Sequence, residues 1–222
     1  MTENKKNLYV LLGTSLVTQA TTSLIGGIIG IGPFNDTGSM ADAMIGIAGN
    51  ITGAYIGIFL QVITAIVIIV LGTALYQAGK HINQTLAIIA FGLYLTEAVI
   101  HIVNQIIVVA LAEISRLFLI SGDASLVNMG TILYAARDFC GGITMMPFGL
   151  GAIMFYYLIM KSNVIPKWLG LWGLISVPFI LVGWTLEAFN VSLPFVLYAP
   201  YVPWEWVAGI YIFIKSLREA SR

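Results

Sequence analysis

A stripe of polar side chains inside an apolar segment offers the first candidate chemistry. In LTEAVIHIVNQ, Glu97, His101 and Asn104 occupy positions i, i+4 and i+7, and Gln105 follows directly. This spacing places the first three side chains along one face of a helix. A carboxyl and an imidazole one turn apart can act as an acid–base pair, or as metal ligands if neighbouring helices supply further groups.

Charged groups at a similar depth are expected on two later helices. Arg137 and Asp138 lie within the first two turns of one of them, and Glu205 lies in YAPYVPWEW on the other, near Tyr201. A charge at the bilayer centre costs at least about 2.5 to 3.5 kcal/mol, so such groups must face one another, a cavity or a partner. Three carboxylates and one guanidinium leave an excess of negative charge. Protonated carboxyls, a protonated histidine, a bound cation or a water-filled cavity would each offset that excess.

The favoured interpretation is a polar, acidic cavity in the outer half of the bilayer, which binds or passes a small cation, an amphiphile or a lipid headgroup. The candidate lining residues are Glu97, His101, Asn104, Gln105, Arg137, Asp138, Tyr201 and Glu205. The structural alternative is a hydrogen-bond network that only fixes helix packing.

Two further functions stay open. An intramembrane enzyme would use Glu97 and His101, but the chain has no H-E-x-x-H or G-x-S-x-G motif and no histidine cluster. No catalytic or metal-binding residue is therefore assigned, and no cofactor is expected. A structural or regulatory subunit would instead dock a second copy or another membrane protein through a glycine face such as Gly26 and Gly30.

Composition decides what solvent surrounds these groups. Of the 222 residues, 59% are hydrophobic and only 9% are charged, and the mean hydropathy is +0.96. So few charges cannot cover a water-exposed surface, so membrane lipid is expected to be the main solvent. A net charge of zero gives no support for nucleic-acid binding. A single cysteine, Cys140, excludes an intrachain disulfide.

Hydropathy and length predict an all-α bundle of six transmembrane helices in one domain, residues 1–222. A span needs about 20 residues, and the first apolar segment is too long for a signal peptide. The expected spans are residues 8–31, 52–76, 85–112, 131–160, 168–189 and 195–214.

The basic residues predict the orientation of the spans. With the N-terminus inside, eight of the ten lysines and arginines fall on the cytoplasmic side, and only Arg116 and Arg137 do not. Both termini are therefore expected in the cytoplasm.

Two shorter segments also carry predictions. Between the first two spans, Asn35 and Asp36 suit a turn or helix cap, and residues 40–48 form either a short interfacial helix or a loose loop. Before and within the last span, Pro200 and Pro203 are expected to kink or loosen the first turn. Trp204 and Trp206 are typical of interfacial anchors.

Three stretches resemble a known family. They are ALYQAGKHINQTLA at 74–87, FGLGAIMFYYLIMKSNVIPKWLGLWGLI at 148–175 and PWEWVAGIYIFIKSL at 203–217. Together with the K-S-x-x-x-P-[KR]-x-L-G turn from Lys161 to Gly170 and the late Glu205, they resemble the bacterial membrane family named domain of unknown function 4386. The resemblance implies a multi-pass protein of the bacterial cytoplasmic membrane and no established activity. The resemblance assigns no role to Glu97 or His101.

Overall fold

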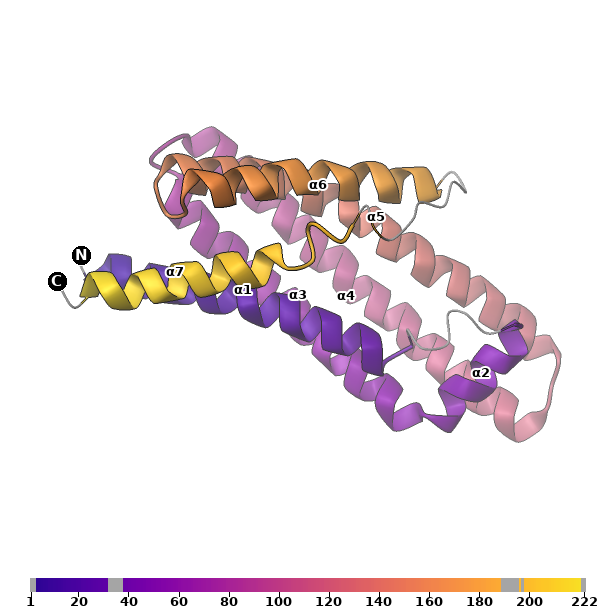
Figure 1. Cartoon of the computed structure of the whole chain (residues 1–222). Helices are drawn as coiled ribbons and strands as arrows, with labels where there is room; N and C mark the ends of the chain where they lie inside the picture. Colours follow the sequence, from indigo (N-terminus) through magenta and orange to yellow (C-terminus); the bar gives the residue numbers. More distant parts are fainter. Residues whose placement is uncertain (1–2, 32–37, 189–195, 197, 221–222) are drawn as a thin grey trace. The chain divides into compact units, whose positions relative to one another are not determined.

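The secondary structure is helical throughout the computed structural model, which describes residues 3–31, 38–188, 196 and 198–220. No strand occurs among these residues, which confirms the predicted all-α class. Figure 1 shows the helices in chain order: α1 (Glu3–Ile29), α2 (Met40–Gly49), α3 (Ile51–Gly79), α4 (Gln84–Ser121), α5 (Ser125–Lys161), α6 (Lys167–Ala188) and α7 (Trp204–Ala220).

Five helices within the described residues are long and apolar enough to cross a membrane, namely α1, α3, α4, α5 and α6. The sixth expected span, residues 195–214, differs from the structure. Residues 198–203 form turns, and α7 is a helix of 17 residues that begins at Trp204. Pro203 lacks a backbone N–H but offers its carbonyl to Val207, 3.0 Å away, so it suits the position just before the helix.

The third and fourth spans extend beyond the predicted bounds of 85–112 and 131–160. α4 has 38 residues and α5 has 37. At a rise of about 1.5 Å per residue, each is longer than the ~30 Å hydrocarbon core. Gly122, with φ of 65°, ends α4, and the Asp123 carboxylate accepts a 2.9 Å hydrogen bond from the Ser125 amide to cap α5. The predicted bounds leave a connecting segment between these two spans, whereas in the structure α4 and α5 take up most of that segment.

Of the two alternatives for residues 40–48, the structure shows the helix, α2. Its N-cap is Ser39, whose hydroxyl oxygen accepts a hydrogen bond of 3.1 Å from the Asp42 amide. Asn35 and Asp36, the predicted turn or cap residues, lie outside the described residues. Ala43, Met44 and Ile47 are buried, so one face of α2 belongs to a core.

The chain packs as two units. Unit 1 consists of Met1–Ala20, Ile66–Ala98 and Gly142–Arg222, and unit 2 consists of Thr21–Ala65 and Val99–Gly141. The prediction that residues 1–222 form one domain stays a prediction.

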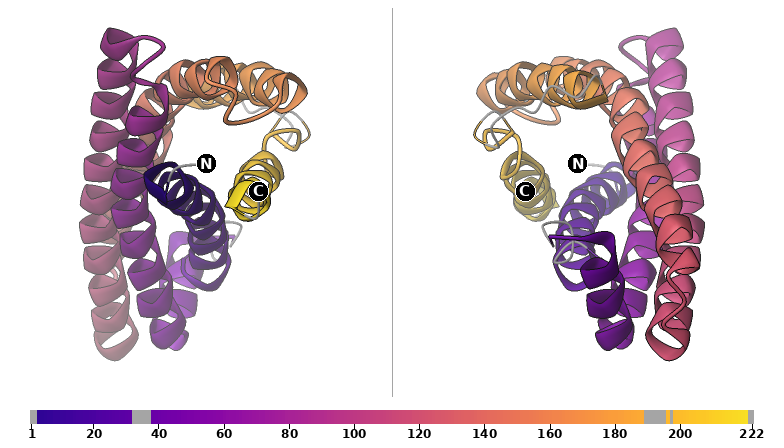
Figure 2. Two further views of the ribbon diagram at one scale, coloured as in Figure 1. Left: turned by 90° about the vertical axis from the view of Figure 1, so that its left-hand side faces the viewer. Right: turned by 90° about the vertical axis from the view of Figure 1, so that its right-hand side faces the viewer.

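In unit 1, α1 and α7 lie side by side and run antiparallel (Figures 1 and 2). The two backbones meet at Gly13 and Gly209: a Cβ on Gly13 would lie 2.7 Å from the Gly209 carbonyl oxygen. At one end of this helix pair, the Lys215 ammonium of α7 lies 5.6 Å from the centre of the Tyr9 ring of α1. The start of α1 and the end of α7 therefore share one end of unit 1.

Aromatic side chains fill the core of unit 1 beside α7. The Tyr156 and Trp204 ring centroids are 3.9 Å apart, and the Tyr94 and Phe155 rings meet edge to face at 5.0 Å. Trp204 is 0% exposed, and its indole N–H donates to the Leu169 carbonyl oxygen at 2.8 Å. The prediction that Trp204 is an interfacial anchor is therefore wrong, because the core of unit 1 satisfies both its ring and its N–H.

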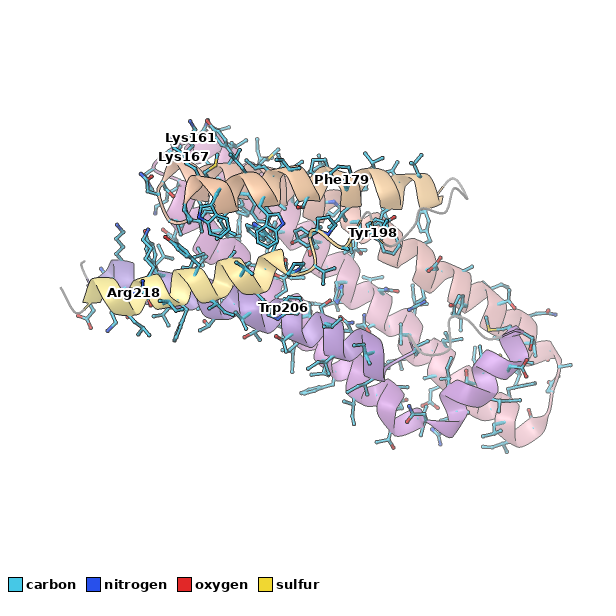
Figure 3. All side chains as sticks on the ribbon, in the orientation of Figure 1. Lys161, Lys167, Phe179, Tyr198, Trp206 and Arg218 are labelled. Carbon is cyan, nitrogen blue, oxygen red and sulfur yellow. The ribbon has the colours of Figure 1, made fainter. Side chains whose placement is uncertain are left out.

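The turn between α5 and α6 is also fixed by α7. Asn163 has a φ of 56°, a left-handed conformation that asparagine tolerates better than most residues. The Lys215 ammonium donates to the Asn163 and Val164 carbonyl oxygens at 2.5 and 3.2 Å. Figure 3 labels Lys161 and Lys167 on either side of this turn. The turn motif that carried the family resemblance is thus a docking point for α7.

In unit 2, α1 and α3 cross at glycines. A Cβ on Gly57 would lie 2.8 Å from the Gly26 carbonyl oxygen and 2.9 Å from the Gly30 nitrogen. Ile31, Ile47 and Leu111 lie in the buried core of this unit. The Gly26 and Gly30 face, considered above as a docking surface for a partner, is packed against α3 of the same chain.

Candidate functional site

Two buried glutamates form the centre of a polar group in unit 1. Glu97 is 4% exposed and Glu205 is 8% exposed, and they lie close enough for their charges to interact. We call these two residues, with Gln19, Tyr156 and Tyr201, the carboxyl cluster.

Local structure explains why Glu205 points inward. It lies in the first turn of α7, next to the buried Trp204. One turn further on, Gly209 lets α7 approach α1 closely enough for Gln19 to reach the carboxylate. The first turn of a helix also carries a partial positive charge, which favours an acidic side chain at this position.

Hydrogen bonds connect Glu205 to the aromatic core. The Tyr201 hydroxyl donates to Glu205 Oε1 at 2.7 Å, and Gln19 Nε2 donates to the same oxygen at 3.4 Å. The Tyr201 and Tyr156 hydroxyl oxygens are 2.9 Å apart. Because Tyr201 gives its proton to Glu205, Tyr156 must donate to Tyr201.

Glu97 is less completely paired. It lies three residues after Tyr94 on α4, and three-residue spacing puts both on one face. Its Oε2 atom is buried and has no hydrogen-bond partner among the described residues. No ion pair to Glu97 or Glu205 occurs there either. A buried carboxyl oxygen without a partner is costly, which makes it a candidate ligand atom.

Unit 2 holds a second polar group, which lines a pocket of about 100 Å³. His101 Nε2 lies 2.9 Å from Gln61 Oε1, and Gln105 donates to the His101 carbonyl oxygen at 3.4 Å. Asn104 Oδ1 is buried without a hydrogen-bond partner in the described chain. At about 30 Å³ per molecule, this pocket is large enough for about three waters.

Arg137 and Asp138, adjacent residues of opposite charge on α5, lie in different surroundings. Arg137 lines the unit 2 pocket, and its guanidinium stands 5.4 Å from the centre of the Tyr134 ring. Asp138, the next residue, is exposed and is not among the lining residues. Successive helical side chains point about 100° apart, which accounts for the difference.

The eight predicted site residues therefore fall into two groups. Unit 1 contains Glu97, Tyr201 and Glu205, and unit 2 contains His101, Asn104, Gln105, Arg137 and Asp138. Of the unit 2 residues, all but Asp138 line the same pocket. A ligand role for any of the eight stays a prediction.

Sequence reasoning missed three contributors. Gln61 was not singled out, although it is the only amide side chain between Ile51 and Leu71. Gln19 was not among the predicted site residues, and Tyr156 lay in a stretch noted only for its family resemblance. An isolated amide in a membrane-length helix is a signal that could have identified Gln61.

The described residues contain no group of three or more histidine, cysteine, aspartate or glutamate side chains placed to hold a metal ion. The oxygen atoms of the carboxyl cluster belong to carboxyl, hydroxyl and amide groups. Such oxygens suit hard cations, whereas zinc and copper sites prefer nitrogen and sulfur.

Helices of membrane-spanning length and a buried polar interior define an all-helical protein of the membrane type. More particularly, the chain belongs to the family described as domain of unknown function (DUF4386), which matches residues 11–216. No curated protein and no solved structure gives a significant match to the chain. Membership of this family assigns no activity to any residue, so the function must be argued from the site.

Proposed function

We propose that the protein binds a small cation in the membrane, at the carboxyl cluster of unit 1. The carrying observation is the pair of buried glutamates, Glu97 and Glu205, that has no ion-pair partner in the described chain. The buried, unpartnered Oε2 of Glu97 provides a free ligand atom. The location that fits is a bacterial cytoplasmic membrane, with both termini in the cytoplasm.

Charge balance supports this choice. Two ionised carboxyls in a low-dielectric interior repel each other, and each carries a large desolvation cost. Without a bound ion, a proton on each carboxyl removes both charges. A cation would replace the proton of Glu97, while Glu205 keeps its proton and is held in place by Tyr201 and Gln19.

The site favours a small, hard ion over an organic one. Its donor atoms are carboxyl, hydroxyl and amide oxygens, which bind such ions at about 2.3 to 2.6 Å in the case of calcium. The aromatic rings of Tyr156 and Trp204 pack against each other at 3.9 Å, so they do not form an open aromatic cage for a bulky ammonium group.

Calorimetric titration of the purified protein in detergent tests the proposal. The wild type would be titrated with lithium, sodium, potassium, magnesium and calcium chlorides in two buffers of different ionisation enthalpy. We expect one of these ions to bind, with release of protons that appears as a buffer-dependent heat. Glu97→Gln and Glu205→Gln should each weaken binding by about tenfold or more, because the ion loses a carboxyl ligand.

Glu113→Gln is the matched control. Glu113 is a partly exposed glutamate in unit 2, paired with Arg116 at 3.1 Å and with the Tyr55 hydroxyl, so its loss should leave cation binding unchanged. Absence of binding by the wild type across all five ions would reject the proposal. In that case the glutamates form a packing network, and replacement by glutamine should be silent or stabilising.

A further inference from the structure

A cavity of unit 1, apart from the carboxyl cluster, lies at the end that carries the start of α1. Its volume is about 540 Å³. α1, the end of α3 and the turn after α5 all contribute to its wall. The lining residues are Asn4, Lys5, Leu8, Tyr9, Gln77, Ala78, His81, Ser162 and Val164.

Positive charge gathers at this cavity. Lys5 lines it, and its ammonium lies 5.5 Å from the centre of the Tyr9 ring. Lys215 lies 5.6 Å from the centre of the same ring and donates to the carbonyl oxygen of Val164, another lining residue. The carboxylate nearest to Lys5 in sequence, Glu3, is exposed and is not part of the wall. Two ammonium groups around one buried ring repel each other, and an anion in the cavity would relieve that repulsion.

Neutral donors complete the arrangement. Asn4 and Gln77 have amide N–H groups, Ser162 has a hydroxyl, and His81 has a ring N–H. These groups come from three different segments and surround one space. A phosphate group has several acceptor oxygens arranged around a tetrahedral centre, so it can accept from several directions, whereas a carboxylate has two oxygens in one plane.

We propose that this cavity binds the phosphate group of an anionic lipid headgroup or of a soluble phosphate ester. Both sources present the same chemistry to Lys5 and His81. Position favours the lipid, because basic pockets at the ends of membrane helices are where headgroup phosphates lie. The volume accommodates a phosphate together with the glycerol carbons attached to it.

Native mass spectrometry of the full chain released from detergent micelles tests the proposal. The protein would be incubated with phosphatidylglycerol, and the fraction of protein carrying one lipid would be measured across lipid concentrations. We expect saturable binding of one lipid. Lys5→Gln should weaken it by about fivefold, because one lysine near an anionic headgroup contributes about that much. The double variant with His81→Gln should weaken it further.

Lys161→Gln is the matched control. Lys161 belongs to unit 1, flanks the turn after α5 and stands 5.7 Å from the Tyr157 ring, but it does not line the cavity. Its variant should bind phosphatidylglycerol like the wild type. Thermal unfolding of all variants would verify that each is folded before binding is compared.

Competition with soluble glycerol 3-phosphate separates the two sources. Displacement of phosphatidylglycerol at concentrations that saturate the site would identify a soluble phosphate ester as a sufficient ligand. No displacement would show that the lipid's acyl chains are needed as well, and either result supports a phosphate site. Equal losses in Lys5→Gln and Lys161→Gln, or no loss in Lys5→Gln, would overturn the proposal.

Discussion

The hydroxyl of Tyr201 links Glu205 to the aromatic core of unit 1. It donates to Glu205 at 2.7 Å and meets the Tyr156 hydroxyl at 2.9 Å. Glu205 Oε1 then has only the longer 3.4 Å contact from Gln19 as a second partner. The Tyr201 hydroxyl is therefore the group that most directly orients Glu205.

Removing this hydroxyl should destabilise the protein. Tyr201→Phe keeps the ring, which meets Phe148 edge to face at 5.6 Å, but leaves Glu205 and Tyr156 with fewer partners. We expect a loss of about 0.5 to 1.5 kcal/mol in the free energy of unfolding, the usual range for one buried hydrogen bond. Equilibrium unfolding in mixed detergent micelles would measure it. Tyr157→Phe, at an exposed tyrosine, is the control, and equal effects of the two changes would contradict this role.

At the scale of elements, glycine decides where helices approach most closely. Gly13 meets Gly209 in unit 1, and Gly57 meets Gly26 and Gly30 in unit 2. The nearest atoms that a side chain on Gly13 or on Gly57 would strike belong to backbone, which cannot rotate away as a side chain can. The small-residue pattern on α1 is therefore explained by contacts within the chain.

We predict that Gly57→Ala will destabilise the protein. The added methyl would press on the backbone of Gly26 and Gly30, so α1 and α3 must move apart. We expect a loss of about 1 to 3 kcal/mol in unfolding free energy, as for overpacked interiors. Gly92→Ala on α4 is the control, because its added Cβ would meet no atom within 4 Å. That variant should be neutral or up to about 1 kcal/mol more stable, owing to better helix propensity.

For the whole molecule, the distribution of charge predicts the orientation. The eight basic residues expected in the cytoplasm all lie in segments of unit 1, and the start of α1 and the end of α7 share one end of that unit. The structure thus brings the two ends of the described chain to the same side, as the orientation requires. Which side faces the cytoplasm stays a prediction.

Reporter fusions test the orientation directly. A fluorescent protein that folds only in the cytoplasm should be active when fused after Arg222, because most basic residues are on that side. Alkaline phosphatase, which needs export, should be inactive at the same position and active after Gly122, in the turn between α4 and α5. The reverse pattern would invert the map of the spans.

The sequence predicts the helical class and five membrane-length segments, since each depends on local hydropathy, and it leaves the short helix after the first span as one of two alternatives. It does not predict where α7 begins, because an apolar composition continues through turns around Pro200 and Pro203 that no hydropathy measure detects. Nor can it show that Trp204 is buried, since that depends on Leu169 and Tyr156 from other helices. Of the candidate site, the polar residues are visible as exceptions in apolar segments. Their division between two groups depends on packing that spacing along one helix cannot reveal.

The contact between α1 and α7 also has a consequence for how the protein is made. α1 leaves the ribosome long before α7, yet Gly13 cannot meet Gly209, and Glu205 cannot meet Gln19, until both helices have been inserted. The turn after α5 likewise receives its Lys215 cap only at that stage. Unit 1 must therefore remain incomplete in the bilayer while the intervening helices are added. During that interval the polar faces of α1 and α4 have to be sheltered by lipid headgroups, by water or by the insertion machinery.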